Sequence, residues 1–169
     1  KERLLEKQMK GDTYMNFYLD FETFTKGVKC HTPFLACAEA EDGHQFTFWK
    51  RTEKTNLGSK VIGAIAKYAA SKNKHPRVFA HNMRYDFRFI VNEMNRLQTI
   101  EPNGRFVVAW GNVGGTIEES VINPKTGKTE KRNVDMKIQI RDSYTMISEP
   151  LRNFGKLFPN ISTEKDVMP

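Results

Sequence analysis

The sequence has few cysteines and no long apolar segment. Only two of its 169 residues are cysteine, Cys30 and Cys37, so we expect free thiols in a reducing, intracellular compartment. No apolar run approaches the length that spans a membrane, and no secretory signal pattern is present. We therefore expect no membrane partner. Internal repeats and low-complexity tracts are also missing, which is typical of an ordinary globular domain.

The two cysteines leave one metal-binding alternative open. A zinc site is conceivable for Cys30, His31, Cys37 and His44, although their spacing matches no common zinc finger. The chain starts at Lys1 rather than at a methionine and stops at Pro169, just after a polar segment. We therefore expect it to be a piece of a longer protein.

Length and charge narrow the class of protein. A chain of 169 residues with 38% hydrophobic and 11% aromatic residues fits one globular domain with a sizeable core. Its net charge is +7 and its isoelectric point is about 9.4. This balance suits a phosphate-rich partner such as nucleic acid. Charge alone does not identify a partner, because many basic proteins bind nothing anionic.

The pattern of apolar residues predicts alternating strands and helices. Residues 1–13 are charged and read as a linker or N-terminal extension, and residues 14–169 read as one domain. Asp42-Gly43 marks a hairpin turn, and residues 57–71 have the spacing of an amphipathic helix. A second helix carries Phe87, Ile90, Val91, Met94 and Leu97, and a third begins near Ser148 and runs to Phe158. We predict strands at 14–24, 34–40, 45–49, 77–81, 106–110, 116–122 and 136–140.

The order of these elements predicts an α/β fold with a mixed sheet flanked by helices. Three strands joined by hairpins come first, and a helical crossover then returns the chain to a strand parallel to the first. This is the ribonuclease H-like arrangement. Trp49 and Trp110 are expected to pack in the core or within hairpins. The basic turn that contains Lys125 and Lys128 is expected either to contact nucleic acid or to be a solvated loop.

The first expected strand carries two carboxylates, in the run Asp20-Phe21-Glu22. Side chains in a strand alternate between faces, so Asp20 and Glu22 share one face and Phe21 is buried on the other. Two like charges held this close repel each other. The pair cannot contribute to the stability of the fold by itself, so a divalent cation bound between the two carboxylates is the better explanation for it.

A second polar cluster lies between the strand at 77–81 and the next helix. Asn82 and Asp86 are the residues of this cluster whose side chains can accept hydrogen bonds at the start of the helix. Taken alone, they suit an ordinary helix cap, in which a side chain accepts from free amides of the first turn. In open α/β sheets, ligand-binding and catalytic sites commonly lie at the carboxyl ends of the strands. Asp20, Glu22 and Asp86 are therefore predicted to meet over one edge.

Together these clusters resemble the first two exonuclease motifs of family B DNA polymerases, and most of all the protein-primed branch of phages, linear plasmids and organelles. Asp20-Phe21-Glu22-Thr23 resembles the first motif, and His81-Asn82-Met83-Arg84-Tyr85-Asp86 resembles the second. Asp142-Ser143 and the segment after it are similar to a third stretch of the family. The resemblance covers about residues 15–160 and places the chain in the DEDD-type, ribonuclease H-like superfamily.

The resemblance implies a function and a set of site residues. The chain would be the 3′–5′ proofreading exonuclease domain of a DNA polymerase, which hydrolyses the 3′ ends of single-stranded DNA. Asp20, Glu22 and Asp86 would be catalytic and would hold two ions of Mg²⁺ or Mn²⁺. The single strand would be bound by Thr23, Asn82, Tyr85, Ser143 and Tyr144. Phe89 is a further stacking candidate, although a place in the core is the favoured expectation for it. Candidate phosphate contacts are Lys26, Lys29, Arg84 and Arg88, of which Arg88 suits a solvated helix face equally well.

The resemblance also implies partners and a setting. The rest of a polymerase chain and a terminal protein primer would be partners, in the replication of a virus, a linear plasmid or an organelle such as the mitochondrion. The family's last motif, Tyr-x-x-x-Asp, has no match after residue 150 and is expected beyond Pro169.

Two alternatives stay open. One is a catalytically incomplete ribonuclease H-like domain that acts as a nucleic-acid-binding or structural subunit of a larger particle. The other is a related exonuclease that acts on RNA.

Overall fold

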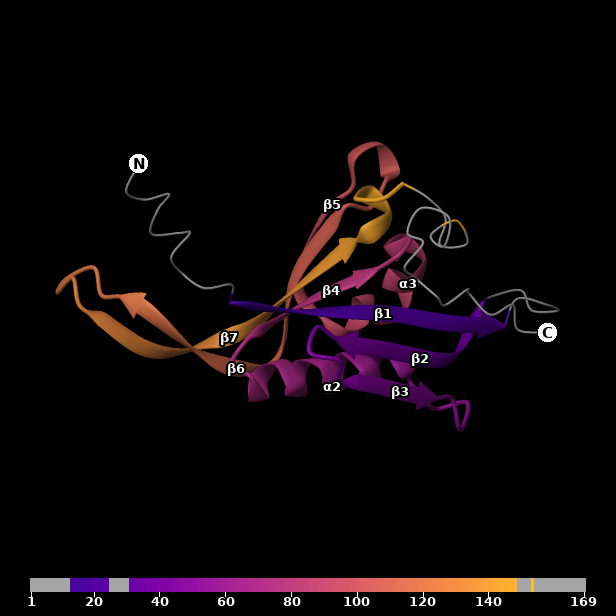
Figure 1. The fold of residues 1–169 in the computed structure, drawn as a ribbon, viewed down its shortest axis with the longest axis horizontal. Coiled ribbons are helices and arrows are strands. Elements are labelled where there is room, and N and C mark those ends of the chain that lie inside the picture. The colour runs from indigo at the N-terminus through magenta and orange to yellow at the C-terminus, as the bar shows by residue number, and fades with distance from the viewer. Residues whose placement is uncertain (1–12, 25–30, 149–152, 154–169) are drawn as a thin grey trace.

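A computed structural model describes residues 13–24, 31–148 and 153 of the chain. The described residues form a seven-stranded mixed sheet with two α-helices, as Figure 1 shows. The strands are β1 (Tyr14–Phe24), β2 (Thr32–Ala40), β3 (Gln45–Trp49), β4 (His75–Ala80), β5 (Asn95–Ile100), β6 (Val108–Ile122) and β7 (Thr129–Asp142). The α-helices are α2 (Leu57–Ser71) and α3 (Met83–Ile90), and the 3-10 turns are η1 (Val91–Glu93), η2 (Pro102–Gly104) and η3 (Ser143–Thr145).

The strand order confirms the predicted ribonuclease H-like α/β arrangement. The order across the sheet is β3-β2-β1-β4-β7-β6-β5. β1, β2 and β3 are joined as antiparallel neighbours, with the predicted turn at Gly43, whose φ is +86°. β4 returns parallel to β1 after α2, and β7 lies parallel to β4. The carboxyl ends of β1, β4 and β7 consequently lie at the same edge of the sheet.

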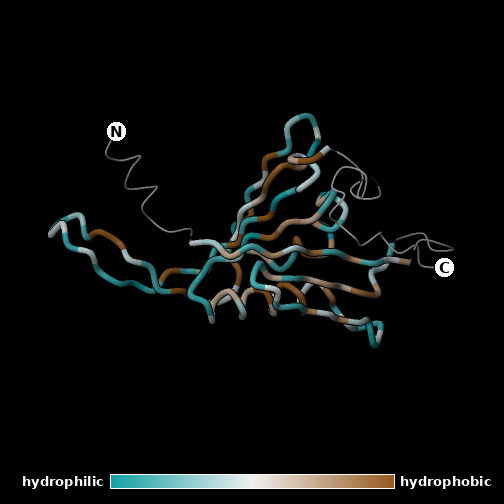
Figure 2. The backbone as a smooth tube through the Cα atoms, in the orientation of Figure 1, coloured by the Kyte–Doolittle hydropathy of each residue, from teal (hydrophilic) through white to brown (hydrophobic). Residues whose placement is uncertain are grey.

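The core lies between one face of the sheet and the helices. Phe17 and Phe21 of β1 point to this face, as the alternation of the strand requires. Val61 and Ile65 of α2 are fully buried against it, and Tyr68 meets the ring of Phe17 edge-on. Apolar residues accordingly gather along the strands and along α2 in Figure 2, where they are brown.

Both helices cover the same face of the sheet. Asn56 caps α2, because its side chain accepts from the backbone N–H of Ser59 at 3.0 Å. α3 lies beside the start of α2, where Gly58 approaches the carbonyl of Phe89 too closely to leave room for a side chain. Phe89 in turn packs on Phe21 at 5.2 Å between ring centroids. α3 is thereby fixed over the carboxyl end of β1.

The second helix is shorter than the sequence predicted. It ends at Ile90, and the segment that contains Leu97 is β5 rather than helix. The spacing of Val91, Met94 and Leu97 imitates a helical face, but Arg96 has a positive φ of 52°, which a helix does not allow. Pairing of β5 with β6 supplies the backbone hydrogen bonds that a longer helix would have made.

Two of the predicted strands are one strand. Residues 108–122 form the single strand β6, and the glycines at 114 and 115 produce a register shift rather than a turn. Gly115 has a φ of +114°, which favours glycine there. Beyond this bulge, β6 and β7 pair only with each other, and the hairpin extends away from the sheet in Figures 1 and 2.

Some predictions concern segments that the structure does not describe. The proposed linker lies almost wholly within residues 1–12, and the proposed helix from Ser148 to Phe158 lies mostly within 149–152 and 154–169. Among the described helices, none has both the length and the apolar character to cross a membrane.

Candidate functional site

The two carboxylates of β1 lie on one face, as predicted. Asp20 is exposed and Glu22 is partly exposed, whereas Phe21 between them is buried on the helix side. On the neighbouring strand, Cys37 lies opposite Asp20 and Leu35 lies opposite Glu22. The pairing with β4 ends at Tyr18, so Asp20 and Glu22 lie past the end of that ladder. The carboxylates therefore stand at the edge where β4 leaves the sheet for α3.

The pKa of the Cys37 thiol shows the electrostatic effect of this pair. Burial raises the pKa of Cys37 above its ordinary value, and a hydrogen bond with Thr47 partly opposes the rise. The negative charges of Asp20 and Glu22 raise it further. The thiol and both carboxylates thus share one face, and the two carboxylates disfavour a further negative charge there, which is the effect that a bound cation would offset.

Three segments that are far apart in the sequence meet at the carboxyl edge of the sheet. Thr23 is near the end of β1, Asn82 follows β4, and Ser143 follows β7. Each was predicted to bind the single strand. Parallel strands bring them together because their carboxyl ends point the same way. The structure therefore places these three residues at the same edge of the sheet as the carboxylate pair.

Tyr85 joins α3 to the end of β1. Its hydroxyl lies 2.5 Å from the Thr23 hydroxyl and 2.7 Å from Nδ1 of His31. The Arg88 guanidinium lies 3.9 Å from the centre of the Tyr85 ring, which holds the ring from one side. Thr23 and Tyr85 thus form one polar unit. His31, the third member, was not predicted because it precedes β2 and matches no motif.

Asn82 does not act as an ordinary helix cap. Its backbone is left-handed, with φ 62° and ψ 50°, and its side chain makes no capping hydrogen bond to α3. Asp142 of β7 holds this backbone instead, because its Oδ1 accepts from the N–H of Asn82 at 3.0 Å and from the N–H of Tyr144 at 2.9 Å. The Asn82 side chain is therefore presented at the surface by a fixed turn.

Ser143 and Tyr144 lie next to His81 at the same edge. The Ser143 hydroxyl is 3.2 Å from Nδ1 of His81 and donates to the carbonyl of Ala80 at 3.3 Å. Tyr144 meets the His81 ring edge-on at 5.2 Å, and the Arg105 guanidinium is 5.5 Å from the Tyr144 ring centre. Through these contacts His81 links β4 to η3.

Asp86 is buried within α3. Only 4% of it is exposed, and it shares the inner side of the helix with Met83 and Ile90. Among the described residues, no group of three or more His, Cys, Asp or Glu is arranged so that it could hold a metal ion. The structure brings Asp20 and Glu22 together on one face but does not gather Asp86 with them into such a group.

The donor set still suits magnesium or manganese. Carboxylate oxygens are the ligands that these ions prefer, and Mg²⁺ is often held by one or two carboxylates with waters and substrate phosphates completing its shell. Asp20 and Glu22 fit that pattern. The zinc alternative gains no support, since Cys30 lies outside the described residues, His44 stacks on Tyr68 and His31 bonds to Tyr85.

Several secondary predictions also have an outcome. Phe89 packs on Phe21 and is a core residue rather than a free stacking surface. Arg84 donates to the carbonyl of Gly104, and Lys26 and Lys29 lie outside the described residues. Trp49 was expected in the core or within a hairpin. It is 56% exposed and packs on Phe34 across the β2–β3 hairpin at 6.3 Å between ring centroids, which fits the second alternative. It lies at the end of the edge strand β3 and points away from α2.

Comparisons with known proteins identify the fold. No family model matches the chain, and no curated protein matches it. Among solved structures, the chain is similar to phi29 DNA polymerase complexed with single-stranded DNA, with a TM-score of 0.61 and 15% identity over 91% of the chain. It is also similar to the same polymerase in a ternary complex with primer-template DNA and incoming nucleotide, with a TM-score of 0.60 and 14% identity.

The chain spans about a quarter of the length of those polymerases, 25% in each case. At this identity the likeness establishes shape rather than activity. The chain has the fold of one part of phi29 DNA polymerase, over 91% of its own length.

Proposed function

We propose that this chain is the 3′–5′ proofreading exonuclease domain of a family B DNA polymerase of the protein-primed type. The observation that carries the proposal is the placement of Asp20 and Glu22 on one open face of β1, beside the edge where β1, β4 and β7 all end. Folding gains nothing from two adjacent like charges, whereas a cation-dependent hydrolase needs them.

The metal-binding part of the proposal concerns three carboxylates. Asp20 and Glu22 would hold the ions directly. Asp86, which is buried in α3 and is not grouped with them, would contribute through water. When bound, two divalent ions supply an activated water and stabilise the charge on the phosphate and on the leaving 3′ oxygen. The chain's own contribution is to fix the two carboxylates on a rigid strand, where neighbours on β2 hold their backbone.

The single strand would be held by the polar groups at the carboxyl edge. The joined hydroxyls of Thr23 and Tyr85 and the exposed amide of Asn82 can bond to the sugar and phosphate of the terminal nucleotide. Ser143 and Tyr144 extend this edge. Such contacts favour a frayed end over a paired one, because a duplex cannot present an unstacked terminal base.

The rest of the proposal concerns the whole protein. A last aspartate, from a Tyr-x-x-x-Asp motif, would come from residues beyond Pro169. Partners would be a polymerase domain of the same chain and a terminal protein primer. The setting would be the replication of a virus, a linear plasmid or an organelle.

One alternative has an observation in its favour. The described residues hold no group of three metal ligands, which suits a ribonuclease H-like domain that binds nucleic acid without cleaving it. Such a subunit would keep the polar edge and lose only hydrolysis.

A nuclease assay separates the two functions. Single-stranded DNA labelled at its 5′ end would be incubated in Mg²⁺ or Mn²⁺ with the 169-residue chain and with a version extended past Pro169. Stepwise 3′ shortening that is lost in Asp20→Ala supports the exonuclease. Glu39→Gln is the matched control, because Glu39 is an exposed carboxylate of β2 on the same face. Tight binding without shortening by either version supports the subunit.

Metal binding gives a second readout that does not depend on activity. Titration of Mn²⁺, followed by calorimetry, should detect binding to the chain that Asp20→Ala weakens and Glu39→Gln leaves unchanged.

A further inference from the structure

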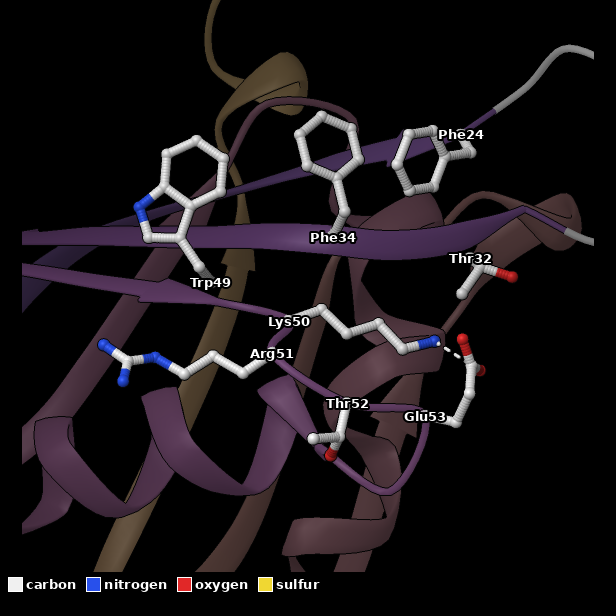
Figure 3. A pocket seen from close by; sticks show the side chains of 8 residues that line it. All are labelled: Phe24, Thr32, Phe34, Trp49, Lys50, Arg51, Thr52 and Glu53. Atoms are coloured by element: carbon white, nitrogen blue, oxygen red, sulfur yellow. Dashed lines mark hydrogen bonds and ion pairs between the residues drawn. The ribbon is translucent and has the colours of Figure 1, made fainter.

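Three aromatic side chains form an open row at the end of the first three strands. Phe24 of β1 and Trp49 of β3 are each 56% exposed, and Phe34 of β2 lies between them. The ring centroids of Phe24 and Phe34 are 4.5 Å apart, and those of Phe34 and Trp49 are 6.3 Å apart. The ring planes in each of the two pairs are inclined by 32°, so neighbouring rings are tilted rather than perpendicular to each other. Figure 3 shows the row.

A β-bulge builds this row. The register of β1 and β2 shifts after Glu22, where Leu35 is opposite Glu22 but Pro33 is opposite Thr23. Phe34 is the extra residue. Regular alternation would point it to the face opposite Leu35, but a bulge re-aims its side chain. Phe34 consequently lies between Phe24 and Trp49 instead of in the core, although large aromatic residues normally gain stability from burial.

The row shares the face of the carboxylate pair. Phe24 follows Glu22 by two residues on β1, which puts them on the same side about 7 Å apart along the strand. Across the strands, Glu22, Leu35 and Trp49 form one register line. Trp49 is therefore two strands from Glu22, or about 10 Å. At one phosphate per 3.4 Å of a stacked strand, that is about three nucleotides.

Cations line the groove below the rings. The groove holds about 700 Å³, and its lining includes Lys50, Arg51 and one anion, Glu53, as well as the three rings. The backbone N–H of Lys50 donates to the carbonyl of Phe34 at 2.8 Å, and its ammonium pairs with Glu53 at 3.1 Å. Arg51 is exposed, and its charge makes no ion pair with any described residue. Aromatic faces beside a basic groove are what single-stranded nucleic acids bind.

We propose that Phe24, Phe34 and Trp49 are a stacking platform for unpaired bases of single-stranded DNA upstream of the 3′ terminal nucleotide, with Arg51 on the backbone. A row of exposed aromatic rings accepts any base, because every base has a π face. The platform lengthens the bound segment without reading its sequence. The direction of the strand rests on the proposed function, since the carboxylate pair marks the 3′ end, but binding itself does not.

Binding without hydrolysis tests the platform. Anisotropy of labelled oligothymidylate would be measured in EDTA, where the ions for cleavage are removed. Trp49→Ala should weaken binding of an eight-nucleotide strand by about tenfold and leave the affinity for a dinucleotide unchanged. Trp49→Phe should restore most of the affinity, whereas Trp49→Leu, which is apolar but lacks a π face, should not. Equal loss for both lengths would overturn the proposal.

Two further measurements distinguish base stacking from non-specific apolar binding. In a Trp110→Phe background, emission of Trp49 should be quenched by the single strand but not by a blunt duplex. Arg51→Gln should reduce the slope of log affinity against log salt by about 0.7, the value for one phosphate contact on a single strand. Ile122→Ala is the control, since Ile122 is equally exposed at 56% but lies at the far hairpin.

Failure of this inference differs from failure of the proposed function. Normal 3′ shortening with affinity that is indifferent to Trp49→Ala would reject the platform and keep the exonuclease. Affinity that depends on Trp49, with no shortening by the chain or by the version extended past Pro169, would keep the platform and reject the exonuclease. If Trp49→Ala changed only self-association in sedimentation, the row would be an interface between copies and the proposal would be wrong.

Discussion

The hydroxyl groups of Thr23 and Tyr85 lie 2.5 Å apart, although 62 positions separate the two residues in the sequence. This contact joins the end of β1 to the first turn of α3. It also places a polar group of the first exonuclease-like motif against one of the second. Neither residue alone would distinguish a binding site from a packed surface.

Tyr85→Phe should weaken binding of the 3′ end. The change removes the hydroxyl that links Thr23 to His31 but keeps the ring under Arg88. We expect a loss of about 1 kcal/mol in the free energy of unfolding, measured in urea, and a clear loss of affinity for a dinucleotide. Tyr68→Phe is the control, because its hydroxyl donates to Asp42 in the distant hairpin turn. Equal affinity losses in both variants would argue against a role for Tyr85 in binding.

Asp20→Ala should leave the fold intact. Asp20 is exposed and stands next to another negative charge on the same face, so its removal relieves repulsion. We expect the free energy of unfolding to stay within about 0.5 kcal/mol of that of the unaltered chain, or to rise. Thermal unfolding in EDTA measures this, with Glu39→Ala as the matched surface change. A large drop for Asp20→Ala alone would make this carboxylate a structural group.

Asp142→Ala should destabilise the carboxyl edge. The buried carboxylate accepts from the backbone of both Asn82 and Tyr144. Leaving these donors unsatisfied should cost about 2–4 kcal/mol, whereas Asp142→Asn should cost less because an amide oxygen still accepts. Asp135→Ala tests specificity, since Asp135 is exposed on the same strand. Urea unfolding would contradict the assignment if Asp142→Ala and Asp135→Ala behaved alike.

Two glycines of α2 should respond in opposite directions to alanine. Gly63 is exposed, and a methyl group there would meet nothing within 4 Å, so Gly63→Ala should stabilise the chain by about 0.5–1 kcal/mol. A methyl group on Gly58 would overlap the carbonyl oxygen of Phe89. Gly58→Ala should therefore destabilise the chain despite the better helix propensity of alanine. Chemical unfolding of the pair gives the sign of each change.

His75 should make the stability fall as the solution becomes more acidic. Burial lowers the pKa of His75 below its ordinary value of 6.5, although Glu119 opposes the shift and Lys137 adds to it. Nδ1 accepts from the Lys137 backbone at 3.1 Å, so Nε2 carries the proton and donates to Glu119 at 2.8 Å. Protonation of Nδ1 would break the first of these bonds.

The sign follows from linkage. Below pH 6.5 the unfolded chain binds a proton at this position more readily than the folded chain, so the free energy of unfolding decreases as the pH falls. Urea unfolding between pH 8 and pH 5 should show a shallower decrease in His75→Gln than in His44→Gln. An unchanged slope in His75→Gln would show that other groups cause the acid sensitivity.

The local pattern predicted much of the fold correctly. The helix at 57–71 and the hairpin around Gly43 agree with the structure because their signals are short-range, namely a 3.6-residue period and a turn dipeptide. β5 could not be predicted in the same way. Its apolar spacing continued that of α3, and only pairing with β6, which comes later in the chain, made it a strand.

The candidate site was predicted in part for the same reason. Alternation along β1 was sufficient to put Asp20 and Glu22 on one face. It gave no information about His31 or Asp142, because their partners lie 54 and 60 residues away. The sequence left Trp49 between the core and hairpin packing, since nothing local reveals that β3 is an edge strand whose final residue points away from α2.

The sequence alone determined that Asp20 and Glu22 form a like-charged pair on one face, because side-chain alternation is a property of any strand. Only the tertiary structure decided what surrounds that pair. The parallel return of β4 and β7 brought Thr23, Asn82 and Ser143 to one edge, and a bulge in β2 turned Phe34 into line with Phe24 and Trp49. Both depend on register between distant strands, which is set by pairing and packing across the whole sheet.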